Sequence, residues 1–239
     1  MTGRRFRSER TIGLSDVDRD GRLRLDVIAR YLQDVASEDV TDVGRPPNRH
    51  FWVVRRTELQ VVEPFHDDLR VELETWASGT APTAASRRYT LRGDRGGHVE
   101  AESLWIHLDR DLRPLRLDEG FLAIYGPSAA GRRASTRLTL RAPTVEPSRE
   151  WPLRAVDVDR LGHVNNAAYW APVEELWAGR LGGRLHAVLE YRRPIDLGER
   201  VRIAHDGDLM WLVAGGEVRS AARLDPTSTN KSSVFDVKS

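Results

Sequence analysis

The segment Asp16-Val17-Asp18-Arg19-Asp20-Gly21-Arg22-Leu23 returns in the second half of the chain as Asp157-Val158-Asp159-Arg160-Leu161-Gly162-His163-Val164. Each copy follows a short stretch of extended character and precedes a helical pattern. The second copy runs on into Asn165-Asn166, whereas the first runs on into Arg24-Leu25. The repeat predicts a fold built as a tandem pair. The polar residues kept in the second copy predict that the chemistry lies in the second half.

The composition is that of a globular protein. The 239 residues are 40% hydrophobic and 31% charged, and they leave room for two domains of about 110 residues. The net charge of +1 argues against a dedicated nucleic-acid binder. No apolar run approaches the roughly 20 residues of a bilayer span, and none forms a signal-peptide core. The lack of cysteine excludes a disulfide framework and a thiol nucleophile, and it fits a cytoplasmic location.

The first half has the pattern of one long helix followed by strands. Apolar residues at helical spacing predict a helix over residues 26–42, with Asp26 as its cap and Gly44 near its end. An extended segment precedes it, over residues 5–14. β-favouring residues then predict strands over residues 51–63, 68–78, 84–93 and 98–109. We interpret Arg87-Arg88 and Arg192-Arg193 as solvated strand ends, and we prefer this to the alternative that they bind an acidic partner.

The second half repeats this order in a shorter form. A helix is expected after Asn166, and Pro172 should kink it or shorten its regular part. The residues Val61-Val62-Glu63-Pro64 parallel Tyr191-Arg192-Arg193-Pro194 at a smaller separation than that of the opening repeat, so the second copy has a shorter loop between its helix and its first strand. Strands are predicted near residues 185–193, 199–206, 209–214 and 217–224.

One helix across an antiparallel sheet, twice in one chain, matches an α+β tandem double hotdog, in which a curved antiparallel sheet wraps each long helix. We expect an N-terminal unit at residues 1–112 and a C-terminal unit at 151–224. The linker between them, 113–150, should contain a short helix that Asp118 caps and that runs through Tyr125, followed by a surface loop from Gly126 to Thr136. Residues 225–239 are predicted to be a disordered tail.

The second copy of the repeat is the one stretch dense in reactive polar groups. It lies where a strand meets a helix, and such a junction sets a carboxylate beside free backbone N–H groups. Thioester hydrolysis needs this pairing. A thiol with a pKa of about 8.5 leaves with little acid help, so the enzyme has only to activate the nucleophile and to stabilise the oxyanion. Asp159 could act as base or nucleophile, and N–H groups near Asn165-Asn166 could hold the oxyanion. His163 could orient water or pair with Asp159.

Structural roles account for the same residues. An Asp-x-Asp turn is very often a local hydrogen-bonding device, which is the preferred interpretation of Asp157 and an open one for Asp159. At least one of Asn165 and Asn166 is expected to cap the helix. His163 alone would be read as a surface residue. The six other histidines show no metal-ligand spacing, and no phosphate-binding or dinucleotide-binding motif is present, so neither a metal nor a cofactor is predicted.

Further segments, in this order, resemble one known family. They are His50-Phe51-Trp52-Val53-Val54-Arg55-Arg56, Glu74-Thr75-Trp76, Ser103-Leu104-Trp105-Ile106 with Leu108-Asp109-Arg110, Asp159 with His163-Val164-Asn165-Asn166, and Leu189-Glu190-Tyr191-Arg192-Arg193. The chain resembles the acyl-acyl-carrier-protein (acyl-ACP) thioesterases, double hotdog enzymes that release fatty acids. The resemblance implies that Asp159 and His163 are catalytic and that Gly162, Asn165 and Asn166 bind substrate.

The chain departs from the plant-type members of that family at two places. Leu161 stands where they have an asparagine, and Pro194-Ile195 where they have an acidic residue and a cysteine. The remaining pattern, Asp-x-x-Gly-His-Val-Asn-Asn, resembles the wider 4-hydroxybenzoyl-CoA-type hotdog thioesterases, in which one aspartate carries most of the chemistry. In the first copy Arg22 and Leu25 replace the histidine and the second asparagine. The resemblance implies that this half shapes the acyl pocket.

The prediction is therefore a cytoplasmic thioesterase of lipid metabolism that hydrolyses fatty-acyl thioesters, with acyl-ACP preferred to acyl-CoA on family grounds. Its partner is an acyl carrier protein or a CoA thioester, with no nucleic acid and no membrane span. A homodimer is compatible with an exposed sheet edge. The alternatives are an acyl-CoA thioesterase, a non-catalytic acyl-binding protein, motivated by Leu161 and Pro194, and, less favoured, a hotdog hydratase or dehydratase.

Overall fold

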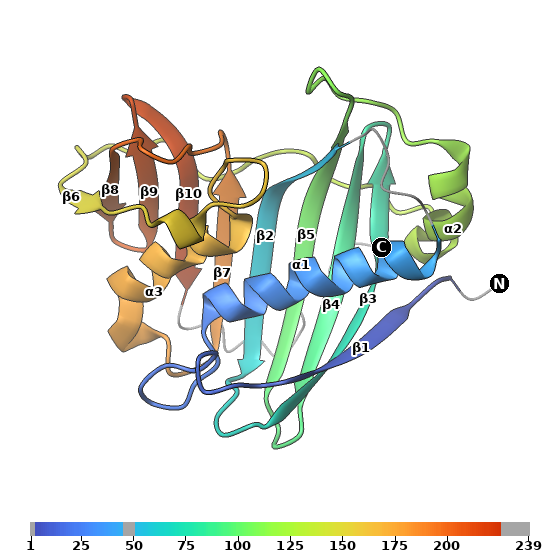
Figure 1. The fold of residues 1–239 in the computed structure, drawn as a ribbon, viewed down its shortest axis with the longest axis horizontal. Helices are drawn as coiled ribbons and strands as arrows, with labels where there is room; N and C mark the ends of the chain where they lie inside the picture. The colour runs from blue at the N-terminus through green and yellow to red at the C-terminus, as the bar shows by residue number, and fades with distance from the viewer. Residues whose placement is uncertain (1–2, 45–50, 226–239) are drawn as a thin grey trace.

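The computed structural model describes residues 3–44 and 51–225. The predicted tail from residue 226 onward and His50 lie outside the described residues. Within them, ten strands form one antiparallel sheet in the order β1-β3-β4-β5-β2-β7-β10-β9-β8-β6, and the helices α1 and α3 lie across the same face of it (Figure 1). We call this face the front face. No helix of the described residues is both long enough and apolar enough to cross a bilayer.

The N-terminal half contains one long helix and five strands. The elements are β1 (Phe6–Thr11), α1 (Leu25–Asp42), β2 (Phe51–Glu63), β3 (Arg70–Ala81), β4 (Ala84–Gly93) and β5 (His98–Leu108). They confirm the predicted helix and strands, with two differences in bounds: β1 is shorter than the extended segment expected over residues 5–14, and β3 begins two residues later than expected and continues to Ala81. α1 runs across the sheet and buries Leu25, Ile28, Leu32 and Val35 against it. These positions follow the spacing of one helix face.

The C-terminal half has five strands and a helix broken into short pieces. The elements are β6 (Arg149–Trp151), the 3₁₀ turns η1 (Ala155–Asp157) and η2 (Asn166–Trp170), α3 (Ala171–Trp177), η3 (Ala178–Arg180), β7 (Leu185–Tyr191), β8 (Val201–Asp206), β9 (Leu209–Ala214) and β10 (Glu217–Asp225). The predicted shortening at Pro172 is confirmed, since a proline has no N–H for the helix ladder. The expectation of one long helix in each unit therefore holds only for the first.

The strand order repeats the sequence duplication. Each half has its first strand after the helix at the centre of the sheet, and β2 and β7 pair there in antiparallel fashion from Arg56↔Glu190 to Val61↔Leu185. The remaining strands follow outward in the same relative order on both sides, ending in β1 and β6. The front face of both halves shares one apolar core, to which Tyr89, Trp170 and Leu189 belong. The two halves thus form one continuous body.

The connection between the halves differs from its prediction at one helix. Asp118 caps α2 (Glu119–Ala129) as expected, because its Oδ1 accepts the Phe121 N–H at 2.6 Å. The helix continues past Tyr125, however, and the predicted loop from Gly126 is wrong over its first four residues. Tertiary contacts outweigh the loop-like composition here. Ala129 is buried, and the Ser128 hydroxyl donates to the Arg4 carbonyl at 2.7 Å.

Two predictions about charged residues are also wrong. Asp26 does not cap α1: its carboxylate lies in the first turn and binds the Arg24 side chain at 2.9 Å. Arg87 is not at a solvated strand end, because its guanidinium is buried in the middle of β4 and donates to Asp39 at 2.7 Å. Asp26 pairs with a near neighbour in the chain, whereas the partner of Arg87 is decided by the packing of α1 on the sheet.

Candidate active site

The two copies of the repeat fold into the same turn. We call residues 17–23 the N-terminal turn and residues 158–164 the C-terminal turn. Both turns contain the same backbone hydrogen bonds, which are Asp18 N–H to Arg22 O (2.8 Å), Gly21 N–H to Asp18 O (3.1 Å), Asp159 N–H to His163 O (2.9 Å) and Gly162 N–H to Asp159 O (3.0 Å). Gly21 and Gly162 have φ of +79° and +84°, a region that glycine enters without strain. The duplication is therefore structural as well as sequential.

Asp157 is a structural residue of the segment before the C-terminal turn. Its carboxylate is buried and accepts the Arg154 N–H at 2.9 Å, and the Arg154 guanidinium approaches it to 2.6 Å. Its carbonyl accepts the Asn165 N–H at 2.8 Å. The preferred interpretation of Asp157 as a local capping residue is confirmed.

Asp159 lies in the C-terminal turn with its side chain partly exposed. Its Oδ1 accepts the Leu161 N–H at 2.8 Å, so the carboxylate also helps to close the turn. Two open hollows on the N-terminal half, one along residues 34–42 of α1 and one across β1, β3 and β4, include none of the predicted site residues. Asp159 itself lies at the start of the segment that leads into η2.

His163 pairs with a carboxylate that sequence reasoning missed. Its Nδ1 lies 2.5 Å from Oδ1 of Asp196, and the two side chains are 45% and 61% exposed. The expected pairing of His163 with Asp159 is not formed; these two residues meet only through their backbones. The residues after β7 bring Asp196 into place, because Val164 N–H donates to the Ile195 carbonyl at 2.8 Å.

A signal for Asp196 exists in the repeat. The alignment that pairs Pro64 with Pro194, continued by two positions, maps Asp196 onto His66. His66 forms the matching antiparallel bridge with Arg22, as Asp196 does with His163. The repeat therefore places residue 196 beside residue 163, although it does not show that their side chains meet.

The two asparagines after the C-terminal turn begin η2. Asn165 caps it as expected, since its Oδ1 accepts the Ala167 N–H at 2.9 Å, and the same oxygen accepts from Gln33 of α1 at 3.1 Å. The Asn166 carbonyl accepts the Tyr191 hydroxyl at 3.0 Å. Burial raises the pKa of Tyr191 well above its ordinary value, so this hydroxyl keeps its proton as a donor. The segment that carries His163 is thereby held to β7.

The N-terminal turn is closed by its own charges. Oδ1 of Asp18 accepts the N–H groups of Asp20 and Arg22, both at 2.9 Å, and Arg22 Nε lies 3.0 Å from its Oδ2. Burial, the largest influence, acts to raise the pKa of Asp18. The N–H groups and the guanidinium together outweigh it, so the pKa lies below its ordinary value. Asp18 is therefore a fixed anion inside an ion pair.

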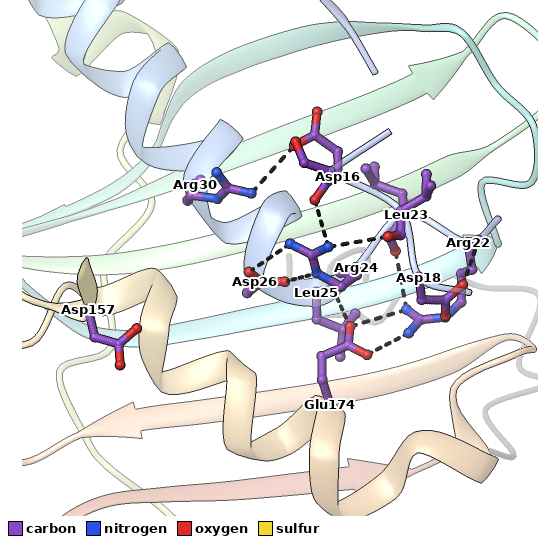
Figure 2. A network of polar contacts seen from close by, with 12 residues as sticks. Asp16, Asp18, Arg22, Leu23, Arg24, Leu25, Asp26, Arg30, Asp157 and Glu174 are labelled. Atoms are coloured by element: carbon purple, nitrogen blue, oxygen red, sulfur yellow. Dashed lines mark hydrogen bonds and ion pairs between the residues drawn. The ribbon is translucent and has the colours of Figure 1, made fainter. Parts of the chain in front are cut away.

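Arg22, at the position of His163, turns inward instead of outward. Figure 2 shows its guanidinium directed at Glu174 of α3, with which it forms an ion pair at 2.5 Å; the side chains are 7% and 14% exposed. Glu174 also accepts the Leu25 N–H at the start of α1, so it supplies the helix cap that Asp26 was expected to provide. Asp157 lies apart from this group in the same view. The N-terminal turn thus joins the halves.

The residues Glu190-Tyr191-Arg192 alternate between the two faces of the sheet. Tyr191 points to the front face and bonds Asn166. Glu190 is fully buried at the back, where its carboxylate accepts the N–H groups of Thr139 and Leu140 from the linker. Arg192 donates to the Leu140 carbonyl. This strand therefore holds the linker on one side and the site segment on the other.

Comparison with known proteins identifies the family. The sequence matches the acyl-ACP thioesterase N-terminal domain over residues 3–125 and the acyl-ACP thioesterase C-terminal domain over residues 141–231. The uncharacterized proteins Rv2001 and MT2057 of Mycobacterium tuberculosis are each 34% identical over 221 residues, covering 89% of this chain and 88% of theirs. The relationship therefore runs through both halves of the chain.

Solved structures share the fold. An acyl-ACP thioesterase from Bacteroides thetaiotaomicron superposes with a TM-score of 0.76 at 17% identity, over 92% of this chain and 96% of that one. The 12:0-ACP thioesterase from Umbellularia californica gives 0.75 at 21% identity, over 94% and 98%. The hotdog fold inferred from the sequence is thereby confirmed at the level of the α+β sheet arrangement. The chain belongs to the acyl-ACP thioesterase family, a family of hydrolases that act on acyl thioesters.

Proposed function

We propose that the protein hydrolyses fatty-acyl thioesters to the free fatty acid, with acyl-ACP preferred to acyl-CoA as the substrate. Family membership supports the reaction class. The preference for a carrier protein rests on the family and on the names of the structural relatives, which include a 12:0-ACP thioesterase. The C-terminal turn is the proposed reaction site, with Asp159 and His163 as its catalytic residues.

The asymmetry of the two turns is the observation that carries the proposal. Both turns hold an aspartate at the same point, but Asp18 is bound by two N–H groups and a guanidinium, whereas Asp159 accepts the N–H of Leu161 in its own turn. The N-terminal turn buries its arginine on Glu174, and the C-terminal turn leaves His163 exposed. The C-terminal turn therefore carries an aspartate and a histidine that are both at least partly exposed, whereas the N-terminal turn has a buried arginine in place of the histidine.

Asp159 can support thioester hydrolysis by either of two routes. The Asp159 carboxylate takes a proton from water as the water oxygen bonds to the thioester carbon, and the tetrahedral intermediate then expels the thiolate, which takes up a proton. In the alternative, Asp159 attacks the carbon directly, the thiolate leaves, and water hydrolyses the mixed anhydride. In both routes, the backbone N–H of Asn166 would hold the oxyanion, because those of Asn165 and Ala167 already donate within the segment. Gly162 would leave room for the substrate.

His163 would position the attacking water. When its Nδ1–H donates to Asp196, the lone pair of Nε2 remains available as an acceptor, so the carboxylate selects the tautomer and fixes the ring. Plant-type members carry an acidic residue and a cysteine at the positions of Pro194 and Ile195. In this chain the carboxylate that contacts the histidine comes instead from Asp196. Asp196 is accordingly proposed as an orienting residue that does not touch the reacting atoms.

The test is thiol release from acyl-CoA and acyl-ACP of graded chain length by the unmodified protein and by Asp159→Ala. Loss of the base should lower kcat by at least about a hundredfold. The matched control is Asp18→Ala, the same substitution in the other turn, which should retain most of the activity of the folded protein. Near-normal turnover by Asp159→Ala would remove Asp159 from the mechanism. Acyl binding without thiol release would instead support a non-catalytic acyl-binding protein, and faster release from CoA an acyl-CoA thioesterase.

A further inference from the structure

Gln33 in α1 and Glu174 in α3 are equivalent positions of the two halves, because the alignment of the two turns, continued without a gap into the helices, pairs them. Each belongs to the helix on the front face of its own half. Each side chain reaches across to the other half: Gln33 contacts Asn165, and Glu174 contacts Leu25. The two halves therefore exchange one polar side chain each, at corresponding places.

In the N-terminal half, this exchanged side chain is an anion. The Glu174 carboxylate accepts the Leu25 N–H and binds the Arg22 guanidinium, and it points between them in Figure 2. A negative charge thus already occupies the space beside the N-terminal turn. The oxyanion that forms from a thioester carbonyl during the reaction would be repelled from this place.

In the C-terminal half, the exchanged side chain is an uncharged amide. Gln33 Nε2 donates to Asn165 Oδ1 at 3.1 Å, and that oxygen also accepts the Ala167 N–H at 2.9 Å. Two donors on one oxygen fix the Asn165 side chain from both sides. A carboxylate at position 33 would set oxygen against oxygen at this contact and bring a negative charge to the segment between His163 and η2.

We propose that Gln33 is a positioning residue for the reaction site of the other half, and that its lack of charge lets that site hold the oxyanion of the reaction, whereas Glu174 brings a negative charge to the equivalent place. The inference rests on the proposed thioesterase function. Gln33 acts through Asn165 and does not touch the reacting atoms. The reaction centre of the C-terminal half is therefore completed by the N-terminal half.

The substitution Gln33→Glu tests the charge, and Gln33→Met tests the hydrogen bond. A negative charge appears on the substrate oxygen only during the reaction, so Gln33→Glu should lower kcat by about a hundredfold with little change in KM. Gln33→Met keeps the length of the side chain and loses its hydrogen bonds to Asn165 and to the Ala29 carbonyl, which should lower kcat by about tenfold. The matched control is Ser37→Glu, which adds the same charge at an exposed position one turn along α1 and should stay within about twofold.

A double variant separates positioning from general damage. If Gln33 acts through Asn165, then Gln33→Met combined with Asn165→Ala should lower kcat no further than Asn165→Ala alone. Multiplied effects would overturn the inference, and this arm decides the question should Gln33→Glu fail to fold in a thermal unfolding control. Turnover of Gln33→Glu equal to that of Ser37→Glu would overturn this inference and leave the proposed function standing. Absence of thiol release by the unmodified protein would overturn the proposed function and this inference with it.

Discussion

Arg22 and His163 occupy the same point in two copies of one turn, yet their side chains bind carboxylates on different sides of the fold. Arg22 is buried and forms an ion pair with Glu174 of the other half, and His163 is exposed and pairs with Asp196 of its own half. The backbone hydrogen bonds of the two turns agree to within a few tenths of an ångström. One scaffold therefore serves as a joint in the first half and as a candidate reaction site in the second.

Removal of the Asp196 carboxylate should weaken catalysis through His163. Asp196→Asn should lower kcat by about tenfold, because an amide can present either its oxygen or its NH₂ group to Nδ1 and so no longer selects one tautomer of the imidazole. His163→Ala should cost at least as much, and the double variant should cost no more than His163→Ala alone. Steady-state thiol release measures all three, with Asp208→Asn in the β8–β9 turn as the control. Full activity of Asp196→Asn would contradict the orienting role.

Glu174 should contribute strongly to stability. Its loss leaves the buried Arg22 guanidinium with Asp18 and the Leu23 carbonyl as partners and removes the acceptor of the Leu25 N–H. Glu174→Ala should therefore lower the free energy of unfolding by about 2 kcal/mol. The neighbouring Glu175 offers a matched control. It pairs with Arg149 at the surface, and Glu175→Ala should change stability by less than about 0.5 kcal/mol. Denaturant unfolding curves compare the two variants. Equal curves would show that the buried contact of Glu174 with Arg22 and Leu25 does not stabilise the fold.

The tyrosines should not ionise in the folded protein near pH 10. Burial raises the pKa of all five, which are Tyr31, Tyr89, Tyr125, Tyr169 and Tyr191. The unfolded chain ionises near its ordinary pKa of about 10, so the stability that these groups contribute is complete below that pH and falls as the pH rises above it. Near-ultraviolet absorbance of tyrosinate should stay flat until the chain unfolds at alkaline pH. A smooth titration with a midpoint near pH 10, while circular dichroism remains native, would refute this.

Glu190 should hold the linker on the back of the sheet. Glu190→Ala leaves the N–H groups of Thr139 and Leu140 without their acceptor, which should detach the linker locally. Trypsin should then cut faster after Arg137 or Arg141. Glu217→Ala is the control, because the half-exposed Glu217 pairs with Arg193 and Arg219 and has no contact with the linker among the described residues. Identical cleavage of the two variants would show that other contacts hold the linker.

Local sequence patterns were sufficient for most of the secondary structure. The strands at residues 84–93 and 209–214 and the end of α1 at Asp42 agree with their predicted bounds. β-branched, aromatic and apolar residues at regular spacing encode these elements within a few neighbouring positions. The site segment could be located for a similar reason, since its residues are contiguous in the chain.

Contacts between distant positions were beyond a local pattern. Glu174 caps α1 from 149 positions away, and Asp196 reaches His163 from 33. Arg87 is buried because Asp39 of α1 lies opposite it, which the residues around Arg87 do not encode. These contacts form only in the folded chain, where α1 and α3 lie across the sheet and the residues after β7 reach the C-terminal turn.

The pairing of β2 with β7 joins two units that need not be alike. In a dimer of identical subunits, every residue stands at two symmetry-related places, so an arginine in place of the histidine would disable both. Fusion into one polypeptide removes that constraint. One copy of the short segment can then hold the two halves together while the other carries out catalysis. A mutation can alter either copy without changing the other.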